Sequence, residues 1–170
     1  MELPICYFCA RTKVLCSKDL ERLERGEISA LDVDISHELV MLKEKKFSQI
    51  DKLSFIKAVR IDENVFLLVR NSTEISRKTL IQIAKYLSAK GYGKVRFIEY
   101  VSDKRALIEQ ILFPVRVLGV DVIWLPDGSS EYNIRINGTC SRKMPFARAQ
   151  AEKIIEQFTG KKTRITFCRR

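Results

Sequence analysis

Three cysteines near the N-terminus have the spacing of a metal-binding site. Cys6 and Cys9 are separated by two residues, and a tight turn between two such cysteines lets both thiolates bind one zinc ion. Six residues separate Cys9 from Cys16, and Asp19 stands where a second Cys-x-x-Cys pair would have its last cysteine. Because a carboxylate oxygen is an acceptable zinc ligand, the sequence predicts one zinc ion bound by Cys6, Cys9, Cys16 and Asp19.

Other interpretations of the cysteines stay open at this point. His37 is a weaker candidate for the fourth ligand, with a solvent-facing helix position as its alternative. The cluster can also be a knuckle that has lost its metal, a redox pair of Cys6 and Cys9, or a disulfide. No thioredoxin-like pattern follows the pair and a reducing cytosol disfavours a disulfide, so the metal site is the favoured hypothesis. Cys140 and Cys168 have no close cysteine partner in sequence and are expected to be buried or incidental.

The charge of the chain is strongly positive and unevenly distributed. Its 170 residues include 31 Lys and Arg against 21 Asp and Glu, which gives a net charge of +10. Residues 135–170 hold ten basic and two acidic residues, a net charge of +8. Such a surplus indicates an anionic partner, and RNA, DNA or an anionic surface is the first expectation, with an acidic protein as the alternative. The residues expected to contact RNA are Arg77, Lys78, Arg142, Lys143, Arg148, Lys161, Lys162 and Arg164.

Composition and motifs disfavour several other classes of protein. No apolar run approaches the roughly 18 residues that span a bilayer, so no membrane partner is expected. The first residues lack the basic and apolar segments of a signal peptide, and we therefore expect a cytoplasmic protein. No nucleotide-binding glycine loop and no Cys-His arrangement occurs, so neither an enzyme nor a small-molecule substrate is expected. A metal-assisted nuclease built on Asp32, Asp34 and Glu38 is the enzymatic alternative, although these residues more simply cap and solvate a helix.

Hydrophobic periodicity predicts an alternation of helices and strands along the chain. Two of the expected strand pairs are hairpins, and Trp124 in the second hairpin would either pack in the core or stack on a base. The strands are predicted at residues 55–61, 65–69, 95–100, 117–125, 132–136 and 163–167. The helices are predicted at residues 19–26, 32–47, 76–90, 102–112 and 147–158, with a loop at 48–54.

The order of these elements occurs twice. Each half has a helix, two strands, a helical region and a final strand, and Ser-Arg-Lys follows the second strand at 76–78 and again at 141–143, 65 residues apart. A matched order at this period predicts two copies of one small α/β (α+β) domain. The expected division is a Cys-rich, zinc-knuckle-like segment at 1–30, one unit with its leading helix at 31–101, and a strongly basic unit at 102–170.

Four segments carry a resemblance to a known family. They are Phe-Pro-Val-Arg-Val-Leu-Gly-Val at 113–120, Phe-Thr-Gly-Lys-Lys-Thr-Arg-Ile at 158–165, the helix-to-strand segment 85–98, and Leu-Pro-Ile-Cys-Tyr-Phe-Cys at 3–9. The first three resemble the corresponding segments of the tandem type II KH domains in NusA transcription factors, whose order is α-β-β-α-α-β. The last resembles the short zinc-binding extension of archaeal NusA-like KH proteins. The resemblance implies two tandem type II KH-like units after a Cys-rich knuckle and helix.

The glycine loop with which KH domains hold nucleic acid is missing from both halves. Its expected positions, 76–79 and 141–144, contain no glycine. Glycines let the backbone approach phosphates closely, so basic side chains would have to do more of the binding here. The resemblance implies a non-catalytic RNA-binding protein that acts in transcription elongation or termination through a basic KH-like surface. The alternative is an adaptor protein that docks on a ribosome or an RNA polymerase.

Overall fold

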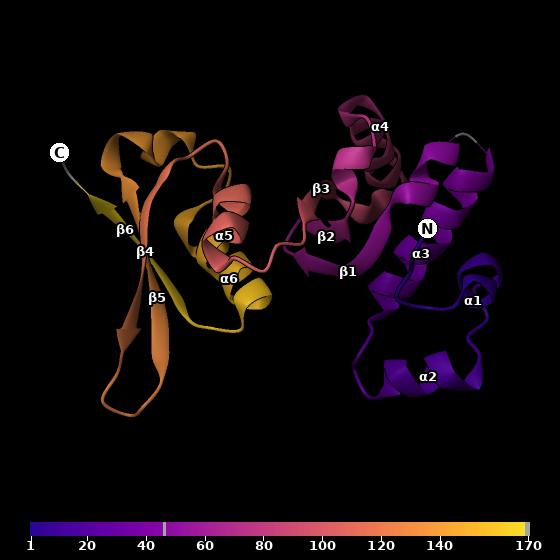
Figure 1. Cartoon of the computed structure of the whole chain (residues 1–170), viewed down its shortest axis with the longest axis horizontal. Helices are drawn as coiled ribbons and strands as arrows, with labels where there is room; N and C mark the ends of the chain where they lie inside the picture. The colour runs from indigo at the N-terminus through magenta and orange to yellow at the C-terminus, as the bar shows by residue number, and fades with distance from the viewer. Residues whose placement is uncertain (46, 169–170) are drawn as a thin grey trace. The chain divides into compact units, whose positions relative to one another are not determined.

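A computed structural model of the chain describes residues 1–45 and 47–168 and divides the chain into two compact units. The first unit is Met1–Tyr100 and the second is Val101–Arg170. Each unit combines helices with one three-stranded sheet (Figure 1), so the predicted mixed α+β class is confirmed. The side chains of Cys140 and Ser141 lie outside the described residues, and with them the expectation that Cys140 is buried or incidental.

Three helices open the first unit, namely α1 (Tyr7–Thr12), α2 (Ser17–Glu24) and α3 (Ala30–Lys45). The sequence predicted the ends of α2 and α3 within two residues. It did not predict α1, because six residues are too few to show the hydrophobic period of a helix. α3 begins before the predicted residue 32 because Ser29 and Asp32 form a capping box. The Asp32 N–H donates to Ser29 Oγ at 3.1 Å, and the Ser29 N–H donates to Asp32 Oδ2 at 2.7 Å.

A mixed sheet completes the first unit. Its strands in spatial order are β1 (Ser54–Ile61), β2 (Asn64–Arg70) and β3 (Lys94–Glu99). β2 pairs antiparallel with β1 through a tight hairpin and parallel with β3. A parallel pair needs a crossover connection, which α4 (Arg77–Leu87) provides. Short 3₁₀ turns at Ser48–Lys52 and Ser72–Glu74 precede β1 and α4, and the first of them lies where the sequence predicted a loop.

α3 packs against different partners on two of its sides. Ile35, Leu39 and Leu42 belong to the main core, together with β1, β2 and α4. Val40 belongs to a smaller core that underlies α1 and α2 and includes Ile5, Cys9, Ala10 and Ile28. A helix buried on two sides has no simple apolar stripe. α3 therefore connects the sheet to the cysteine-bearing helices.

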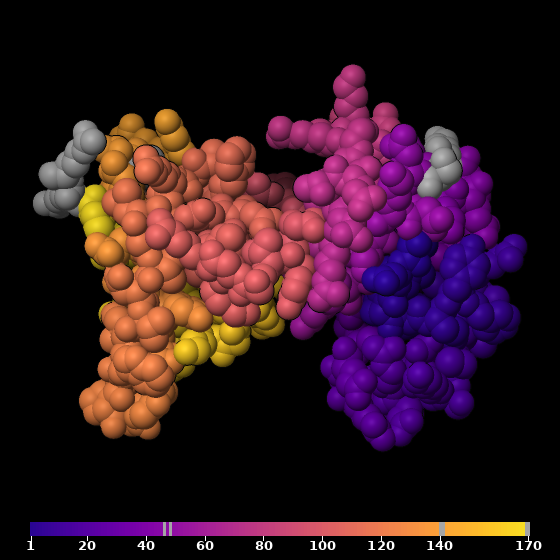
Figure 2. Space-filling model, viewed as in Figure 1, coloured from indigo at the N-terminus to yellow at the C-terminus, as the bar shows by residue number. Residues whose placement is uncertain are grey.

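The second unit repeats the same kind of sheet. Its elements in chain order are α5 (Lys104–Leu112), β4 (Val117–Trp124), β5 (Ser130–Asn137), α6 (Arg148–Thr159) and β6 (Thr163–Cys168). β5 pairs antiparallel with β4 and parallel with β6, and α5 and α6 lie on one face of the sheet (Figure 1). The end of the β4–β5 hairpin extends beyond the part that these helices cover (Figure 2).

The two units also share a detail of strand pairing. In each unit the first strand carries an extra residue near its start, because the register shifts between Phe55 and Lys57 and again between Val117 and Gly119. Such bulges bend a strand and are specific features of a fold. Between the second strand and the long helix each unit has a 3₁₀ turn, Ser72–Glu74 in the first unit and Gly138–Lys143 in the second. The element order is thus repeated, with one long helix rather than two between the second and third strands.

The two Ser-Arg-Lys segments do not occupy equivalent positions, contrary to the sequence prediction. Ser76 caps α4, so Arg77 and Lys78 lie in the first turn of that helix. The segment 141–143 lies in the 3₁₀ turn that precedes α6. The reason is a longer connection in the second unit, ten residues at 138–147 against six at 71–76. The counterpart of Arg77 is therefore Arg148, the first residue of α6.

The remaining predicted elements agree with the structure. All six predicted strands are present, and their ends differ from the observed ones by no more than two residues. Asp103 caps α5 and Gly160, with φ 71°, ends α6, as their residue types indicate. None of the helices in residues 1–45 and 47–168 has both the length and the apolar character needed to span a bilayer.

Candidate functional site

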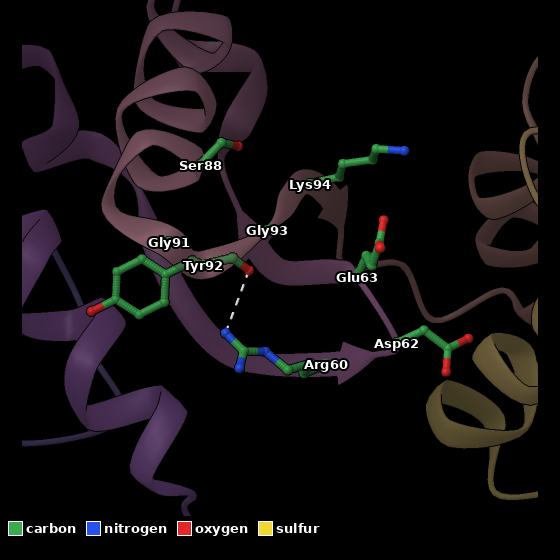
Figure 3. A pocket seen from close by; sticks show the side chains of 8 residues that line it. All are labelled: Arg60, Asp62, Glu63, Ser88, Gly91, Tyr92, Gly93 and Lys94. Carbon is green, nitrogen blue, oxygen red and sulfur yellow. Dashed lines mark hydrogen bonds between the residues drawn. The ribbon is translucent and has the colours of Figure 1, made fainter.

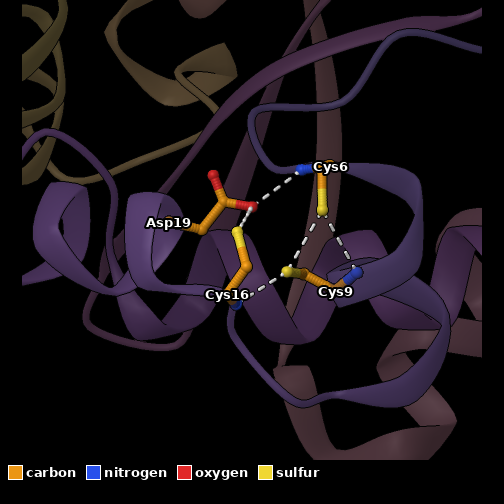
Figure 4. A group of neighbouring side chains, drawn as sticks. All are labelled: Cys6, Cys9, Cys16 and Asp19. Carbon is orange, nitrogen blue, oxygen red and sulfur yellow. Dashed lines mark hydrogen bonds between the residues drawn. The ribbon is translucent and has the colours of Figure 1, made fainter.

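Two short helices bring four possible metal ligands together at their N-termini. Cys6 is the N-cap of α1 and Cys9 lies in the first turn of that helix. Cys16 and Asp19 take the same two positions in α2. The three Sγ atoms and a carboxylate oxygen of Asp19 all lie within 4.8 Å of one another (Figure 4). The four residues that the sequence singled out therefore form one cluster that could hold a metal ion.

Backbone hydrogen bonds cross between the two helices in a reciprocal pattern. The Cys6 N–H donates to Asp19 Oδ2 at 3.0 Å, and the Cys16 N–H donates to Cys9 Sγ at 3.1 Å (Figure 4). Each cap residue thus binds the first-turn side chain of the other helix. The Cys9 N–H also donates to Cys6 Sγ at 3.4 Å. Hydrogen bonds of this kind orient metal ligands and stabilise their negative charge.

The donor set fits a four-coordinate ion. Ligands at about 2.3 Å from a tetrahedral zinc ion lie about 3.8 Å from one another. The distance from Cys6 Sγ to Cys9 Sγ is 3.2 Å, and that from Cys16 Sγ to Asp19 Oδ2 is 3.6 Å. Small movements would bring both pairs to the ideal separation. The three cysteines are free, since a disulfide would need a separation of about 2.05 Å between two sulfur atoms.

The ionisation of the cluster follows from its surroundings. Burial raises the pKa of the Cys9 thiol to about 12. The pKa of Cys16 is lowered, first by the backbone N–H of Asp19 and then by the Cys9 side chain. Burial acts to raise the pKa of Asp19, but the Cys6 N–H and the surrounding thiols together lower it. The cluster thus holds an ionised carboxylate beside a buried thiol that must lose its proton to bind a cation.

The cluster is anchored from both sides. Cys9 is fully buried in the smaller core, and Asp19 is 3% exposed. The other carboxylate oxygen of Asp19, Oδ1, accepts a hydrogen bond from Arg22 at 3.4 Å. The same Arg22 nitrogen donates to the Pro4 carbonyl at 2.6 Å. Arg22 therefore ties the chain before Cys6 to α2 and partly offsets the negative charge of the ligands.

His37, the weaker ligand candidate, lies outside the cluster. Its Nδ1 lies 2.8 Å from the carbonyl oxygen of Ala10 in α1, and the residue is half-buried rather than facing solvent. His37 thereby joins α3 to α1.

The three carboxylates of the nuclease alternative have separate structural partners. Asp32 is buried, caps α3 and accepts a hydrogen bond from the Ala58 N–H in β1. Asp34 pairs with Lys13 at 3.0 Å. Glu38 accepts a hydrogen bond from the Tyr86 hydroxyl at 3.0 Å. These contacts tie the helices and the sheet of the first unit together.

The basic residues expected to contact RNA are distributed over three places. Arg77 and Lys78 lie at the start of α4 in the first unit. In the second unit, Arg142, Lys143 and Arg148 lie near the end of β6, where the Arg148 guanidinium is 6.0 Å from the Phe167 ring centroid. The residues at the start of β6 are Lys161, Lys162 and Arg164.

The two groups of the second unit are separated by the length of β6. This strand has six residues and rises about 3.3 Å per residue, so its ends lie roughly 16 Å apart. All eight basic residues are exposed except Lys161, which is half-buried. Arg148 forms an ion pair with Glu152 at 3.0 Å, whereas the other seven take part in no ion pair among the described residues. The second unit therefore offers two separate basic regions rather than one patch.

The sequence left two environments open for Trp124, a position in the core or an exposed position that could stack on a base. It is 72% exposed at the end of β4, so it does not pack in a core. The Lys161 Nζ lies 5.8 Å from its ring centroid and 5.4 Å from that of Tyr132. No pattern in the sequence indicated that Tyr132 lies beside Trp124. Only Leu125 separates Trp124 from the Pro-Asp-Gly turn, and this position was a signal for exposure, because the end of a long hairpin lies beyond the helices that cover a sheet.

A pocket of about 490 Å³ lies in the first unit at the end of the β1–β2 hairpin (Figure 3). Gly93 lies in it with φ 87°, and a Cβ at this position would collide with the Glu63 carbonyl, so glycine is required for close packing. Arg60 donates a hydrogen bond to the Tyr92 carbonyl at 3.4 Å. The pocket is lined by Arg60, Asp62, Glu63, Ser88, Gly91, Tyr92, Gly93 and Lys94, whose charges balance.

Comparisons with known proteins give a likeness of fold. No protein-family model and no curated protein matches this chain. The crystal structure of APE1850 aligns with 76% of this chain and 95% of its own, with a TM-score of 0.56 and 14% sequence identity. At this level of identity the chain is similar to APE1850 in fold alone.

Proposed function

We propose that this chain is a non-catalytic RNA-binding protein with two KH-like units, similar to NusA factors of transcription elongation and termination. The observation that carries the proposal is the repeated unit together with the exposed basic residues of its second copy. Both copies have a helix, an antiparallel strand pair and a crossover helix that leads to a parallel strand. The segments that resemble NusA lie at the ends of these helices and strands.

In this proposal, side chains rather than a glycine loop contact the RNA backbone. The connections before the long helices, 71–76 and 138–147, contain a single glycine, Gly138, and no Gly-x-x-Gly pair. Arg77, Lys78 and Arg148 lie in the first turns of α4 and α6, where a helix N-terminus adds a favourable field for a phosphate. Neutralising several phosphates makes binding strongly dependent on salt.

The metal of the N-terminal cluster is zinc in this proposal, with a structural role. Three thiolates favour a soft or borderline ion, and four protein ligands leave no open position for a substrate. The ion would hold the N-termini of α1 and α2 together above α3. Mass spectrometry under native conditions tests this: one zinc per chain is expected, and a stably folded protein that contains no metal would contradict it.

The RNA-binding proposal is tested by fluorescence anisotropy with labelled RNA between roughly 50 and 200 mM salt. Replacing Lys161 and Lys162 by Gln removes two charges from the second unit. If both contact phosphates of a single strand, the slope of log K against log salt should become less steep by about 1.4. Affinity that is independent of salt would overturn the proposal.

The matched control removes the same charge elsewhere. Lys18 and Lys57 are exposed residues of the first unit, outside every predicted contact. Replacing both by Gln should leave the affinity and its slope nearly unchanged. An equal loss in both double variants would mean that net charge rather than a particular surface governs binding.

A second function, an adaptor that docks on a ribosome or an RNA polymerase, is favoured by a different observation. Phe8, between two cysteines of the cluster, is 65% exposed, and Tyr7 beside it is 45% exposed. These side chains would give a metal-stabilised knuckle an apolar contact surface. Affinity purification after nuclease treatment should then recover ribosomal or polymerase subunits. Phe8→Ala should lose them, while Leu118→Ala, at an apolar residue 47% exposed in the second unit, should keep them.

A further inference from the structure

The end of the β4–β5 hairpin exposes three apolar residues in succession. Trp124 is 72% exposed, Val122 45% and Ile123 44%. Because Trp124 pairs with Ser130 and Val122 with Tyr132, these four side chains share one face of the hairpin, whereas Ile123 lies on the other face. Single exposed apolar residues are ordinary, but an exposed indole beside an exposed valine on one face indicates a contact surface.

A lysine from another part of the unit reaches the same face. Lys161 lies between α6 and β6, and its Nζ donates to Ser130 Oγ at 2.7 Å. This contact holds the ammonium group 5.8 Å from the Trp124 ring centroid and 5.4 Å from that of Tyr132. A cation at this distance interacts favourably with the faces of both rings. The result is an exposed aromatic ring with a positive charge held beside it.

The charges around this surface favour a polyanion along one side. Lys162 is exposed next to Lys161 in sequence, whereas Arg164 pairs with Asn133 and lies on the other face of the sheet. The turn carries Asp127, whose pKa is lowered by the Ser129 hydroxyl and N–H and, to a smaller degree, by the charge of Lys162. A phosphate backbone would therefore run along the side of Lys161 and Lys162, with its bases toward the tryptophan.

We propose that Trp124, Tyr132 and Lys161 form a stacking platform for unpaired bases of single-stranded RNA. This inference rests on the proposed function and identifies its substrate as unpaired rather than duplex RNA. Proteins that bind single strands without sequence preference commonly combine aromatic side chains, on which bases stack, with basic side chains. The bases of a duplex are already stacked on one another, so they cannot stack on an aromatic side chain of the protein. A protein partner is the competing occupant, but an apolar protein surface would leave the ammonium group of Lys161 without an opposite charge.

The experiment uses Trp124 as its own reporter, because it is the only tryptophan of the chain. The full chain is titrated with an oligouridine of about twelve nucleotides, within the usual range of single-strand site sizes, and with an RNA duplex of the same length. Stacking of a base on the indole should quench its fluorescence with the single strand and not with the duplex. Absence of quenching while the oligouridine binds would overturn the platform and leave the proposed function standing.

Variants separate stacking from folding. Trp124→Ala should weaken oligouridine binding, measured by anisotropy, by about 5- to 100-fold, and Trp124→Phe should restore most of the loss. Leu20→Ala, at an apolar residue 45% exposed in the first unit, is the control and should bind as the parent does. Equal binding by Trp124→Ala and the parent would overturn the platform. Failure of the parent chain to bind any RNA would instead overturn the proposed function itself.

Discussion

The two units share an element order and a strand bulge but differ in where they add structure. The first unit adds α1 and α2 before its leading helix, and α3 has 16 residues against nine in α5. The second unit has no such addition but extends its hairpin through a longer turn at 125–129. The first unit has placed the buried Cys9 thiol in a second core, and the second unit exposes aromatic and basic side chains. The same framework thus carries added helices at its start in one unit and an extended hairpin in the other.

The largest expected effect comes from the cysteine cluster of the first unit. Cys9→Ser should abolish metal binding and lower the stability of the first unit by more than about 4 kcal/mol, because the buried thiol and the cross-link between α1 and α2 are both lost. Metal content is measured by mass spectrometry and stability by urea unfolding followed by circular dichroism. Cys168→Ser, in the second unit, is the control and should keep the metal. A Cys9→Ser protein as stable as the parent would show that the cluster does not stabilise the fold.

Core substitutions test whether the units fold independently. Ile83 in α4 and Ile154 in α6 are both fully buried, one in each unit. Replacing either by Ala should cost about 2–5 kcal/mol. Tryptophan fluorescence reports only on the second unit, because Trp124 is the sole tryptophan, while circular dichroism reports on both. Ile83→Ala should therefore shift the dichroism transition but not the fluorescence transition. A common shift would mean that the units unfold together.

The starts of the two leading helices provide a smaller contrast. Asp32 is buried at the start of α3 and also binds the Ala58 N–H of β1, whereas Asp103 at the start of α5 is exposed and binds the Arg105 N–H. Asp32→Ala should cost about 2–3 kcal/mol, since it removes a cap and leaves a buried N–H without its acceptor. Asp103→Ala should cost about 1 kcal/mol. Equal losses, measured by urea unfolding, would contradict the difference in burial.

The pH dependence of metal binding gives the most graded effect. Because burial raises the pKa of Cys9, its thiol is protonated at neutral pH without metal and must release a proton on binding. Metal affinity should then fall about tenfold, or about 1.4 kcal/mol, per pH unit for each proton released as pH decreases. Asp19, whose pKa is lowered, is already ionised and should add no proton. Competition with a chromophoric chelator at several pH values measures this slope, and a flat profile would contradict it.

Local patterns in the sequence predicted most of the secondary structure and the members of the cysteine cluster. Gly160, Asp103 and the alternating strands act through neighbouring residues, so their effects are visible in the sequence. The position of Asp19 was also predictable, because spacing within two short segments decides it. The structure brings its carboxylate to the three thiols.

Features that depend on the length of a connection or on packing were not predictable in this way. The Ser-Arg-Lys segments matched by composition, but four additional residues before α6 separate the second of them from its helix. The exposure of Trp124 depends on how far the helices extend along the sheet, which periodicity does not report. His37 binds the Ala10 carbonyl through the packing of α1 on α3, a contact between segments 27 residues apart.

The bulge in β4 allows the two ends of the strand to present side chains on one face. Side chains alternate between the faces of a regular strand, so residues seven positions apart, such as Val117 and Trp124, would otherwise lie on opposite faces. With the shift between Val117 and Gly119, Val117 lies opposite Ile136 and Trp124 lies opposite Ser130, and these two partners share a face of β5. The buried start of β4 and its exposed tryptophan thus belong to the same face of the sheet. One extra residue therefore lets a single strand pack in the core at one end and expose an indole on that same face at the other.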